Sequence, residues 1–197
     1  MQRILILLLA ALCVASCGRR RNAPSQDAAA SDTRPRVFLP AIAPSGLSPE
    51  ERRDYLREHY WDRFDFADTL FTVRADTLQM VEAYARYIAL ISDRPTDGAP
   101  IDSLMRRASS SRKMLDYFSM LAERVLHDPN SPLRNDEFYI PVLQAQLRAP
   151  WYDEYERIAP EYDLEMAMQN RLGHPANDFR YTLASGASGT LYGLKAE

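Results

Sequence analysis

Three carboxylates at a regular spacing are the first residues whose types could support chemistry. Asp62, Asp65 and Asp68 recur at every third position, and carboxylates on one face could together hold a hard cation such as Ca²⁺. A calcium loop also needs a glycine where it turns, and no glycine lies between these aspartates. Aspartates at helix ends and in turns commonly cap backbone N–H groups. We therefore expect structural roles for these residues and predict no metal site.

The three histidines do not show a ligand or catalytic pattern. His59, His127 and His174 are far apart in the sequence and lack the short spacing of zinc ligands. The sequence also contains no glycine-rich phosphate loop and no nucleophile elbow. We expect each histidine to be structural or exposed, and we predict no cofactor and no catalytic residue.

Tyrosine and tryptophan side chains are prominent and could line a groove that receives a peptide or a partner protein. In a helical domain, such side chains also bridge the core and the surface, with their polar ends at the rim. Both interpretations stay open from the residues alone. The candidates for a partner groove are Tyr60, Trp61, Tyr139, Trp151 and Tyr155.

The two thiols, Cys13 and Cys17, lie in a segment with the features of an export signal. An arginine precedes a short apolar run (residues 4–12), which is much shorter than the roughly 20 residues that cross a bilayer. The four residues that end at Cys17 resemble the lipobox of bacterial lipoproteins, whose cysteine becomes acylated. We expect a signal peptide over residues 1–16 and a lipid at Cys17, including palmitate, so that the mature chain retains no free thiol.

The residues after Cys17 predict a tether at a membrane. Residues 17–46 are rich in alanine, serine and proline and show no apolar periodicity, which is typical of a flexible linker. Gly18 differs from the aspartate that retains lipoproteins in the inner membrane, so we expect the outer membrane, facing the periplasm. The membrane is then one predicted partner. The net charge of −3 does not indicate a nucleic-acid partner.

Two helix starts are clear in the segment 47–172. Ser48 and Glu51 have the spacing of a capping box, with a proline in the first helical position. Asp76 is placed to cap a second helix. The apolar stripe expected for that second helix contains Leu78, Val81, Ala85, Ile88 and Ile91.

Two prolines should disturb the later helices. Pro141 should kink or restart one helix, and Pro160 should bend another, which we expect to stop near Gly173. The whole segment 47–172 is predicted to be an α-helical domain of five or six helices. The later helices are expected at about 99–108, 111–126, from Asn135 onward, and 151–171.

The pattern changes in the last segment, residues 173–197. Residues 179–183 alternate between apolar and polar types, residues 184–189 have a turn composition, and residues 190–192 could return as a second strand. The predicted fold class is therefore mostly α, followed by an incomplete β-hairpin. Because a lone hairpin is marginally stable in water, we expect that a second domain begins here.

Three segments, residues 59–69, 127–141 and 173–179, resemble a known family. They are similar to the uncharacterised helical domain that precedes a thioredoxin-like domain of the alkyl hydroperoxide reductase/thiol-specific antioxidant type in lipoproteins of some Gram-negative bacteria. The resemblance implies that the hairpin is the start of a thioredoxin-like domain and that the family performs thiol–disulfide exchange. The family's Cys-x-x-Cys motif has no counterpart in residues 1–197, so we expect a chain truncated before it.

The leading functional expectation is a membrane-anchored lipoprotein of the cell envelope. It would be the non-catalytic N-terminal part of a thioredoxin-like protein with a role in redox homeostasis, and no enzyme by itself. One alternative is a free-standing helical module that binds an envelope protein, a peptide or a glycan. A second alternative is half of a split thiol oxidoreductase, completed in trans by a thioredoxin-like domain.

Overall fold

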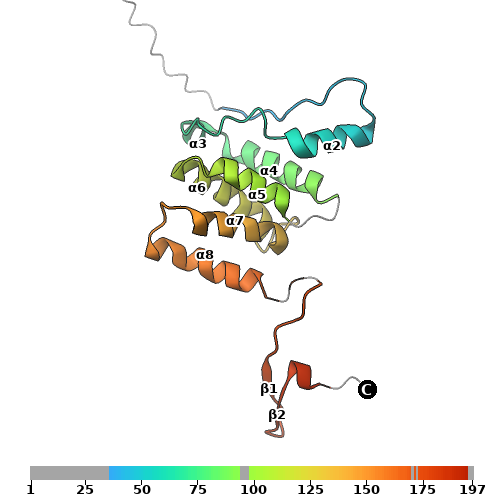
Figure 1. The fold of residues 1–197 in the computed structure, drawn as a ribbon, viewed down its shortest axis with the longest axis vertical. Helices are drawn as coiled ribbons and strands as arrows, with labels where there is room; N and C mark the ends of the chain where they lie inside the picture. Colours follow the sequence, from blue (N-terminus) through green and yellow to red (C-terminus); the bar gives the residue numbers. More distant parts are fainter. Residues whose placement is uncertain (1–35, 94–97, 170, 172, 195–197) are drawn as a thin grey trace, which may run out of the picture. The chain divides into compact units, whose positions relative to one another are not determined.

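Seven α-helices and one two-stranded sheet make up the part of the chain that the computed structural model describes (Figure 1). That part comprises residues 36–93, 98–169, 171 and 173–194. The predicted signal peptide, Cys17 and the first part of the predicted tether lie outside the described residues. The predicted fold class, mostly helical with a small hairpin, is confirmed.

The two helix starts predicted from capping residues are confirmed. Helix α2 (Pro49–His59) begins with a reciprocal capping box: the Ser48 hydroxyl accepts from Glu51 N at 3.3 Å, and Glu51 Oε2 accepts from Ser48 N at 2.8 Å. Helix α4 (Thr77–Ile91) begins after Asp76, whose carboxylate accepts from Gln79 N at 3.0 Å. A single-turn helix, α3 (Phe71–Arg74), lies between them and was not expected.

The apolar stripe expected for α4 is partly wrong. Leu78 is exposed, and Val81 and Ala85 are only half-buried. This helix carries apolar residues around much of its circumference, so periodicity alone did not select the face that meets the core. The residues that α4 buries are Met80, Ala83, Tyr84, Tyr87, Ile88 and Ile91.

The middle helices lie close to their predicted positions. Helix α5 spans Ala99–Ala108 and α6 spans Arg112–Ala122, after which Glu123–His127 forms a π-helical turn. Helix α7 (Asp136–Arg148) starts at the predicted Asn135 cap. Contrary to the expected restart, α7 continues through Pro141 as one helix.

Helix α8 (Glu154–Ala167) is shorter than expected at both ends. It begins after Asp153, which forms a second capping box with Glu156, because an N-cap aspartate supplies the acceptor that the first helical N–H groups need. The helix continues through Pro160 and ends before Gly173, the residue expected to stop it. It packs along α7 (Figure 1).

A cluster of aromatic rings forms one part of the core. The Phe38 ring stacks on Trp61 with a centroid distance of 4.7 Å, and Trp61 meets the Phe118 ring at 5.3 Å. Phe38 is buried although its neighbours Val37 and Leu39 are exposed. The C-terminal end of the predicted tether therefore belongs to the packed structure.

The predicted hairpin is present, but its second strand is shifted. Strands β1 (Arg180–Thr182) and β2 (Ser188–Thr190) are antiparallel, with Tyr181 opposite Gly189. The chain leaves β2 at once in a 3₁₀ turn (Leu191–Gly193), because the Thr190 hydroxyl accepts from Gly193 N at 3.2 Å.

Candidate functional site

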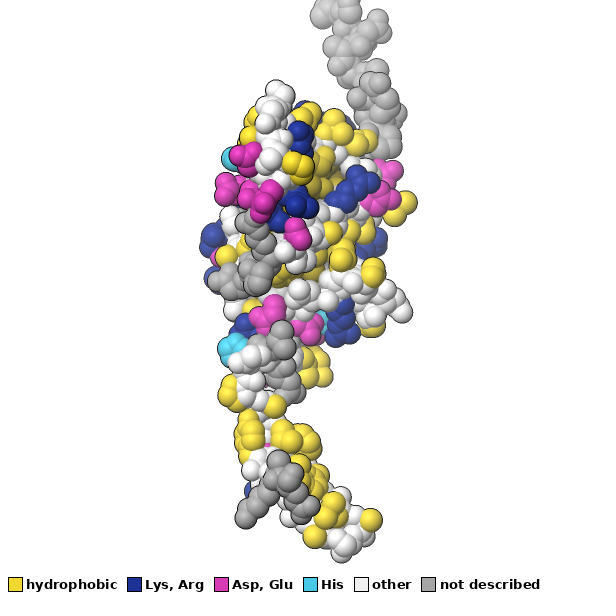
Figure 2. Space-filling view, turned by 90° about the vertical axis from the view of Figure 1, so that its right-hand side faces the viewer, with side chains coloured by type: hydrophobic (Ala, Val, Ile, Leu, Met, Phe, Trp, Pro, Cys, Tyr) yellow, Lys and Arg dark blue, Asp and Glu magenta, His cyan; other side chains and the backbone are white. Residues whose placement is uncertain are grey.

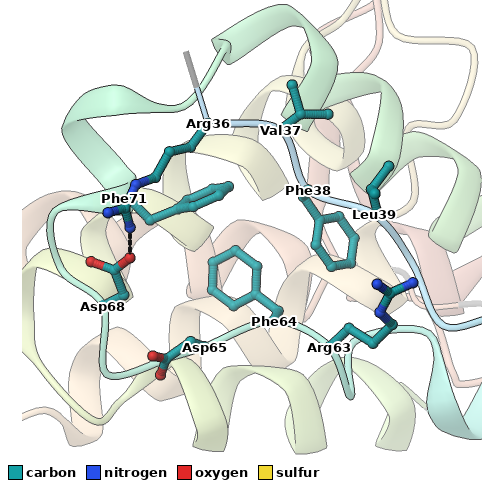
Figure 3. Close-up of a pocket in the computed structure, with 9 residues that line it drawn as sticks. All are labelled: Arg36, Val37, Phe38, Leu39, Arg63, Phe64, Asp65, Asp68 and Phe71. Atoms are coloured by element: carbon teal, nitrogen blue, oxygen red, sulfur yellow. Dashed lines mark hydrogen bonds and ion pairs between the residues drawn. The ribbon is translucent and has the colours of Figure 1, made fainter. Parts of the chain in front are cut away.

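A cavity of about 350 Å³ lies between the extended segment before α2, the loop after α2, and α3 (Figure 3). Its volume is at the lower end of the range for small-molecule and side-chain pockets. Three elements that are separate in the sequence supply its walls. The cavity is lined by Arg36, Val37, Phe38, Leu39, Arg63, Phe64, Asp65, Asp68 and Phe71.

Backbone and side-chain hydrogen bonds hold the extended wall of this cavity. Arg36 N donates to Arg74 O at 2.9 Å in a parallel bridge between Arg36 and Ala75. The backbone of Phe38, two residues after Arg36, forms two hydrogen bonds with the Gln79 side chain. Gln79 Nε2 donates to Phe38 O at 2.8 Å, and Gln79 Oε1 accepts from Phe38 N at 3.3 Å. The wall is therefore tied to α3 and α4.

Aromatic rings form the floor of the cavity. Phe38 and Phe64 are both buried and meet edge to face at 5.5 Å, and Phe64 meets Phe71 in the same way at 4.9 Å. Such edge-to-face pairs fix the orientation of the rings, so the floor is a preformed apolar surface. Figure 3 shows these three rings around the hollow.

Charged side chains border the aromatic floor. Arg36 forms an ion pair with Asp68, so both charges are already paired within the chain. Arg63 is exposed and has no ion-pair partner among the residues that the structure describes. The carboxylate of Asp65 also lines the cavity and forms no ion pair within the described part of the chain. The cavity thus combines an apolar floor with two charges that are not paired with each other or with other described residues, the guanidinium of Arg63 and the carboxylate of Asp65.

Two of the three regularly spaced aspartates, Asp65 and Asp68, cap backbone N–H groups as the sequence predicted. Asp65 accepts from Ala67 N at 2.9 Å, and Asp68 accepts from Leu70 N at 3.1 Å, both as turn caps. Asp62 lies 2.6 Å from His59 Nδ1 and accepts from Arg107 at 3.4 Å. Within the described ranges, no group of three or more histidines, cysteines and acidic residues is arranged to hold a metal ion.

A second cavity of about 300 Å³ lies beside Trp61 and Tyr87. Its two arginines are occupied within the chain. Arg57 donates to Leu90 O at 3.1 Å and to Asp93 at 2.8 Å, and Arg107 donates to Trp61 O at 3.0 Å. Burial raises the pKa of Tyr87 to about 12, so its hydroxyl stays neutral. Both guanidinium groups of this cavity are therefore already engaged, unlike that of Arg63 in the first cavity.

The five candidates for a partner groove do not form one exposed surface. Tyr60, Trp61 and Tyr139 are only 3–5% exposed and belong to the core. Trp151 is half-buried and lines a separate cavity of about 180 Å³, whereas Tyr155 is 80% exposed. Local sequence showed that these residues are large and amphipathic, but it contained no signal for which of them the fold would cover.

The histidines are also spread over the structure. His127 stacks on the Tyr139 ring at 4.6 Å, His174 is exposed, and His59 lies beside Asp62 as described above. The residues that line the first cavity were not predicted as a site. The signal that could have found it is the short apolar patch around Phe38, near the C-terminal end of the predicted tether.

No helix among residues 36–93, 98–169, 171 and 173–194 has both the length and the apolar composition needed to span a membrane.

Comparison with curated proteins gives no match. Among solved structures, the chain is similar to a thioredoxin-like protein from Bacteroides caccae ATCC 43185, with 41% sequence identity and a TM-score of 0.69. The similarity covers 81% of this chain but only 58% of that protein, less than two thirds of its length.

Comparison with protein families shows a match over residues 16–170, which is most of the chain. The matching family is described as a domain of unknown function, DUF5106. The match includes Cys17, the predicted tether and all seven α-helices, and it ends before the hairpin. The chain therefore belongs to the DUF5106 family.

Proposed function

We propose that the chain is the lipid-anchored, non-catalytic helical part of a thioredoxin-like protein of the cell envelope. In this proposal, the helical domain positions a thioredoxin-like redox domain near the outer membrane. The observation that carries the proposal is the 41% identity to a thioredoxin-like protein of which this chain covers only 58%. The uncovered part of that protein gives room for a further domain.

The hairpin supports this proposal through its exposed apolar side chains. Four of them are more than half exposed, although a globular protein would normally bury such residues. Two strands alone are marginally stable and need further sheet or a helix to lie on. Figure 2 shows hydrophobic side chains gathered over this C-terminal segment. The four side chains are Phe179, Leu183, Tyr192 and Leu194.

The positions of the two cysteines support a lipid anchor in this chain and redox cysteines in a different domain. Thiol–disulfide exchange requires an accessible thiolate, and neither Cys13 nor Cys17 lies in the helical domain. If Cys13 leaves with the signal peptide and Cys17 is acylated, the redox cysteines must belong to another domain. The same acylation would keep that domain at the membrane, because two or more acyl chains give stable attachment.

The anchor is tested by Cys17→Ala, with Cys13→Ala as the matched control. In cells fed a clickable palmitate analogue, we expect the wild type and Cys13→Ala to be labelled and to fractionate with the outer membrane. Cys17→Ala should be unlabelled and should leave the membrane fraction. Equal labelling of both variants would contradict the lipoprotein assignment.

The redox context is tested on the gene and on the protein. The DNA that follows the codon for Glu197, and the neighbouring genes, should encode a thioredoxin-like domain with a Cys-x-x-Cys motif. A domain in the same reading frame supports one longer protein, whereas a separate gene supports assembly in trans. The purified chain alone should not reduce insulin disulfides. Absence of any such domain, or turnover by the chain alone, would contradict the proposal.

A second candidate function, a free-standing binding module, is favoured by the cavity beside Arg63. An aromatic floor bordered by a free guanidinium suits a peptide with a C-terminal aromatic residue and carboxylate. The probe is an N-acetylated peptide ending in phenylalanine, titrated against the wild type, Arg63→Ala and the exposed control Arg74→Ala. Loss of binding only in Arg63→Ala would support this function, whereas no binding to the wild type would count against it.

A further inference from the structure

Helix α8 has an exposed apolar face that the domain does not use. Tyr155, Ile158, Tyr162 and Met166 follow each other at intervals of three or four residues, so they share one face of the helix. Their exposed fractions are 80%, 60%, 60% and 40%. We call these four side chains the α8 stripe.

The opposite face of the same helix is already packed. Pro160 is buried, and Leu164 and Ala167 are half-buried against the hydrophobic core. A helix with apolar side chains on two opposite faces is normally covered on both sides. A contiguous exposed apolar patch is rare on a monomeric protein and marks an interaction surface. The α8 stripe therefore indicates a second partner for this helix.

Acidic residues border the stripe. Glu154 and Glu165 are exposed and lie on the same side of it by helical spacing; Glu161, between them in the sequence, pairs with Arg157 at 3.5 Å. An anionic membrane surface would be repelled by this border, whereas a protein surface with an apolar centre and a basic rim would be attracted. The charges therefore favour a protein domain over a lipid surface.

The chain connection limits where the partner can come from. Helix α8 ends at Ala167 and β1 begins at Arg180, so the fully extended connection spans roughly 45 Å at most. Any domain built on β1 and β2 must therefore remain within reach of α8. The hairpin itself exposes apolar side chains, so both ends of this short connection carry uncovered apolar surface.

We propose that the α8 stripe is the docking surface for a thioredoxin-like domain to which β1 and β2 contribute. This inference rests on the proposed function, because that function supplies the domain. It adds the surface that sets the position of the redox domain on the helical domain. The two tyrosines of the stripe are suited to the role, because tyrosine is enriched among the residues that dominate protein interfaces.

Site-specific photo-cross-linking identifies what covers the stripe. A benzophenone amino acid replaces Tyr162 in the complete gene product, produced in its own bacterium, and a control carries the same residue in place of the exposed Leu78 on α4. We expect cross-linked peptides with a thioredoxin-like sequence from position 162 and none from position 78. Cross-links to a second copy of this chain, to lipid, or at equal yield from both positions would overturn the proposal.

A matched pair of charge substitutions tests whether the stripe itself makes the contact. Ile158→Glu and Leu78→Glu introduce the same charge at aliphatic positions that are 60% and 69% exposed. We expect Ile158→Glu to lower the cross-link yield from position 162 by about tenfold, and Leu78→Glu to leave it unchanged. Equal yields would overturn the docking surface even where the gene encodes a thioredoxin-like domain, so this failure is distinct from failure of the proposed function.

Discussion

Helices α6 and α8 belong to the same helical domain but meet different surroundings. Helix α6 buries most of its length, with Met114, Leu115, Phe118 and Leu121 fully covered. Helix α8 is longer, yet Pro160 is its one buried residue. Each large apolar side chain that is covered contributes roughly 1.5–3 kcal/mol to stability. The centre of the domain thus stabilises itself, whereas its C-terminal region retains apolar surface for a partner.

The largest expected difference between these regions is in hydrogen exchange. The opening free energy of amides in α6 should exceed that of residues 179–194 by about 4 kcal/mol or more, because core helices open only with the whole domain. Exchange of the purified chain followed by mass spectrometry measures both. Comparable protection would show that the hairpin packs as tightly as the core and would remove the contrast.

Truncation of one aromatic ring in each region should show the next largest effect. Phe118→Ala should lower the free energy of unfolding by about 3–5 kcal/mol, because Phe118 is fully buried and contacts several rings. Tyr162→Ala, at a position 60% exposed, should change it by no more than about 0.5 kcal/mol. Urea unfolding of both variants measures the difference, and similar losses would contradict it.

Two glycines with similar positive φ angles, one in each region, allow a further comparison. Gly98 and Gly173 have φ angles of +80° and +78°, so alanine strains the backbone similarly at each. A Cβ at Gly98 would lie 2.9 Å from Pro141 Cγ and 3.0 Å from Glu137 O, whereas a Cβ at Gly173 would meet no atom within 4 Å.

Gly98→Ala should therefore cost roughly 1–3 kcal/mol more than Gly173→Ala, because only Gly98 is packed against a neighbouring helix. Thermal unfolding of the two variants measures the difference. Equal losses would indicate that α7 can move aside at Pro141 and that the centre of the domain is less rigid than proposed.

The smallest expected effect concerns the ion pair that links the two regions. Arg171, after α8, donates to Glu137 of α7 at 2.8 Å, and this hydrogen bond holds the pKa of Glu137 below its usual value of 4.5. The pair therefore stabilises the fold above pH 4.5, and its contribution falls as the pH drops through the lowered pKa.

Glu137→Gln should cost less than about 1 kcal/mol at pH 7, and the difference from the wild type should shrink at pH 3. Urea unfolding at both pH values provides the measurement. A difference that grows on acidification would mean that the fold stabilises the neutral, protonated side chain of Glu137 instead of its carboxylate. That outcome would contradict the ion pair.

The features that the sequence predicted well depend on neighbouring residues. The caps at Ser48, Asp76 and Asn135 were identified because each carries an oxygen that reaches a backbone N–H within three residues. The hairpin was also predicted from neighbouring residues, namely the alternation of apolar and polar types and the turn composition between the strands. The turn roles of the aspartates around Asp65 were also expected from local chemistry alone.

The features that the sequence predicted less well depend on distant contacts. The buried face of α4 depends on contacts with distant segments. One of them is the pair of hydrogen bonds between the Gln79 side chain and the backbone of Phe38, 41 residues earlier. The cavity beside Arg63 joins three separate elements, and no local pattern brings them together. The continuation of α7 through Pro141 likewise depends on its surroundings, because neighbouring helices can offset the hydrogen bond that proline removes.

By itself, the sequence determined the helical class, the capped starts of α2, α4 and α7, the approximate position of the hairpin and the N-terminal pattern that predicts lipid at Cys17. These follow from short-range hydrogen bonding and local apolar spacing. Only the tertiary structure decided that Tyr60, Trp61 and Tyr139 are buried while Tyr155, Ile158 and Tyr162 are exposed. Tyrosine and tryptophan tolerate either surrounding, so the decision belongs to the packing of helices that are distant in the sequence.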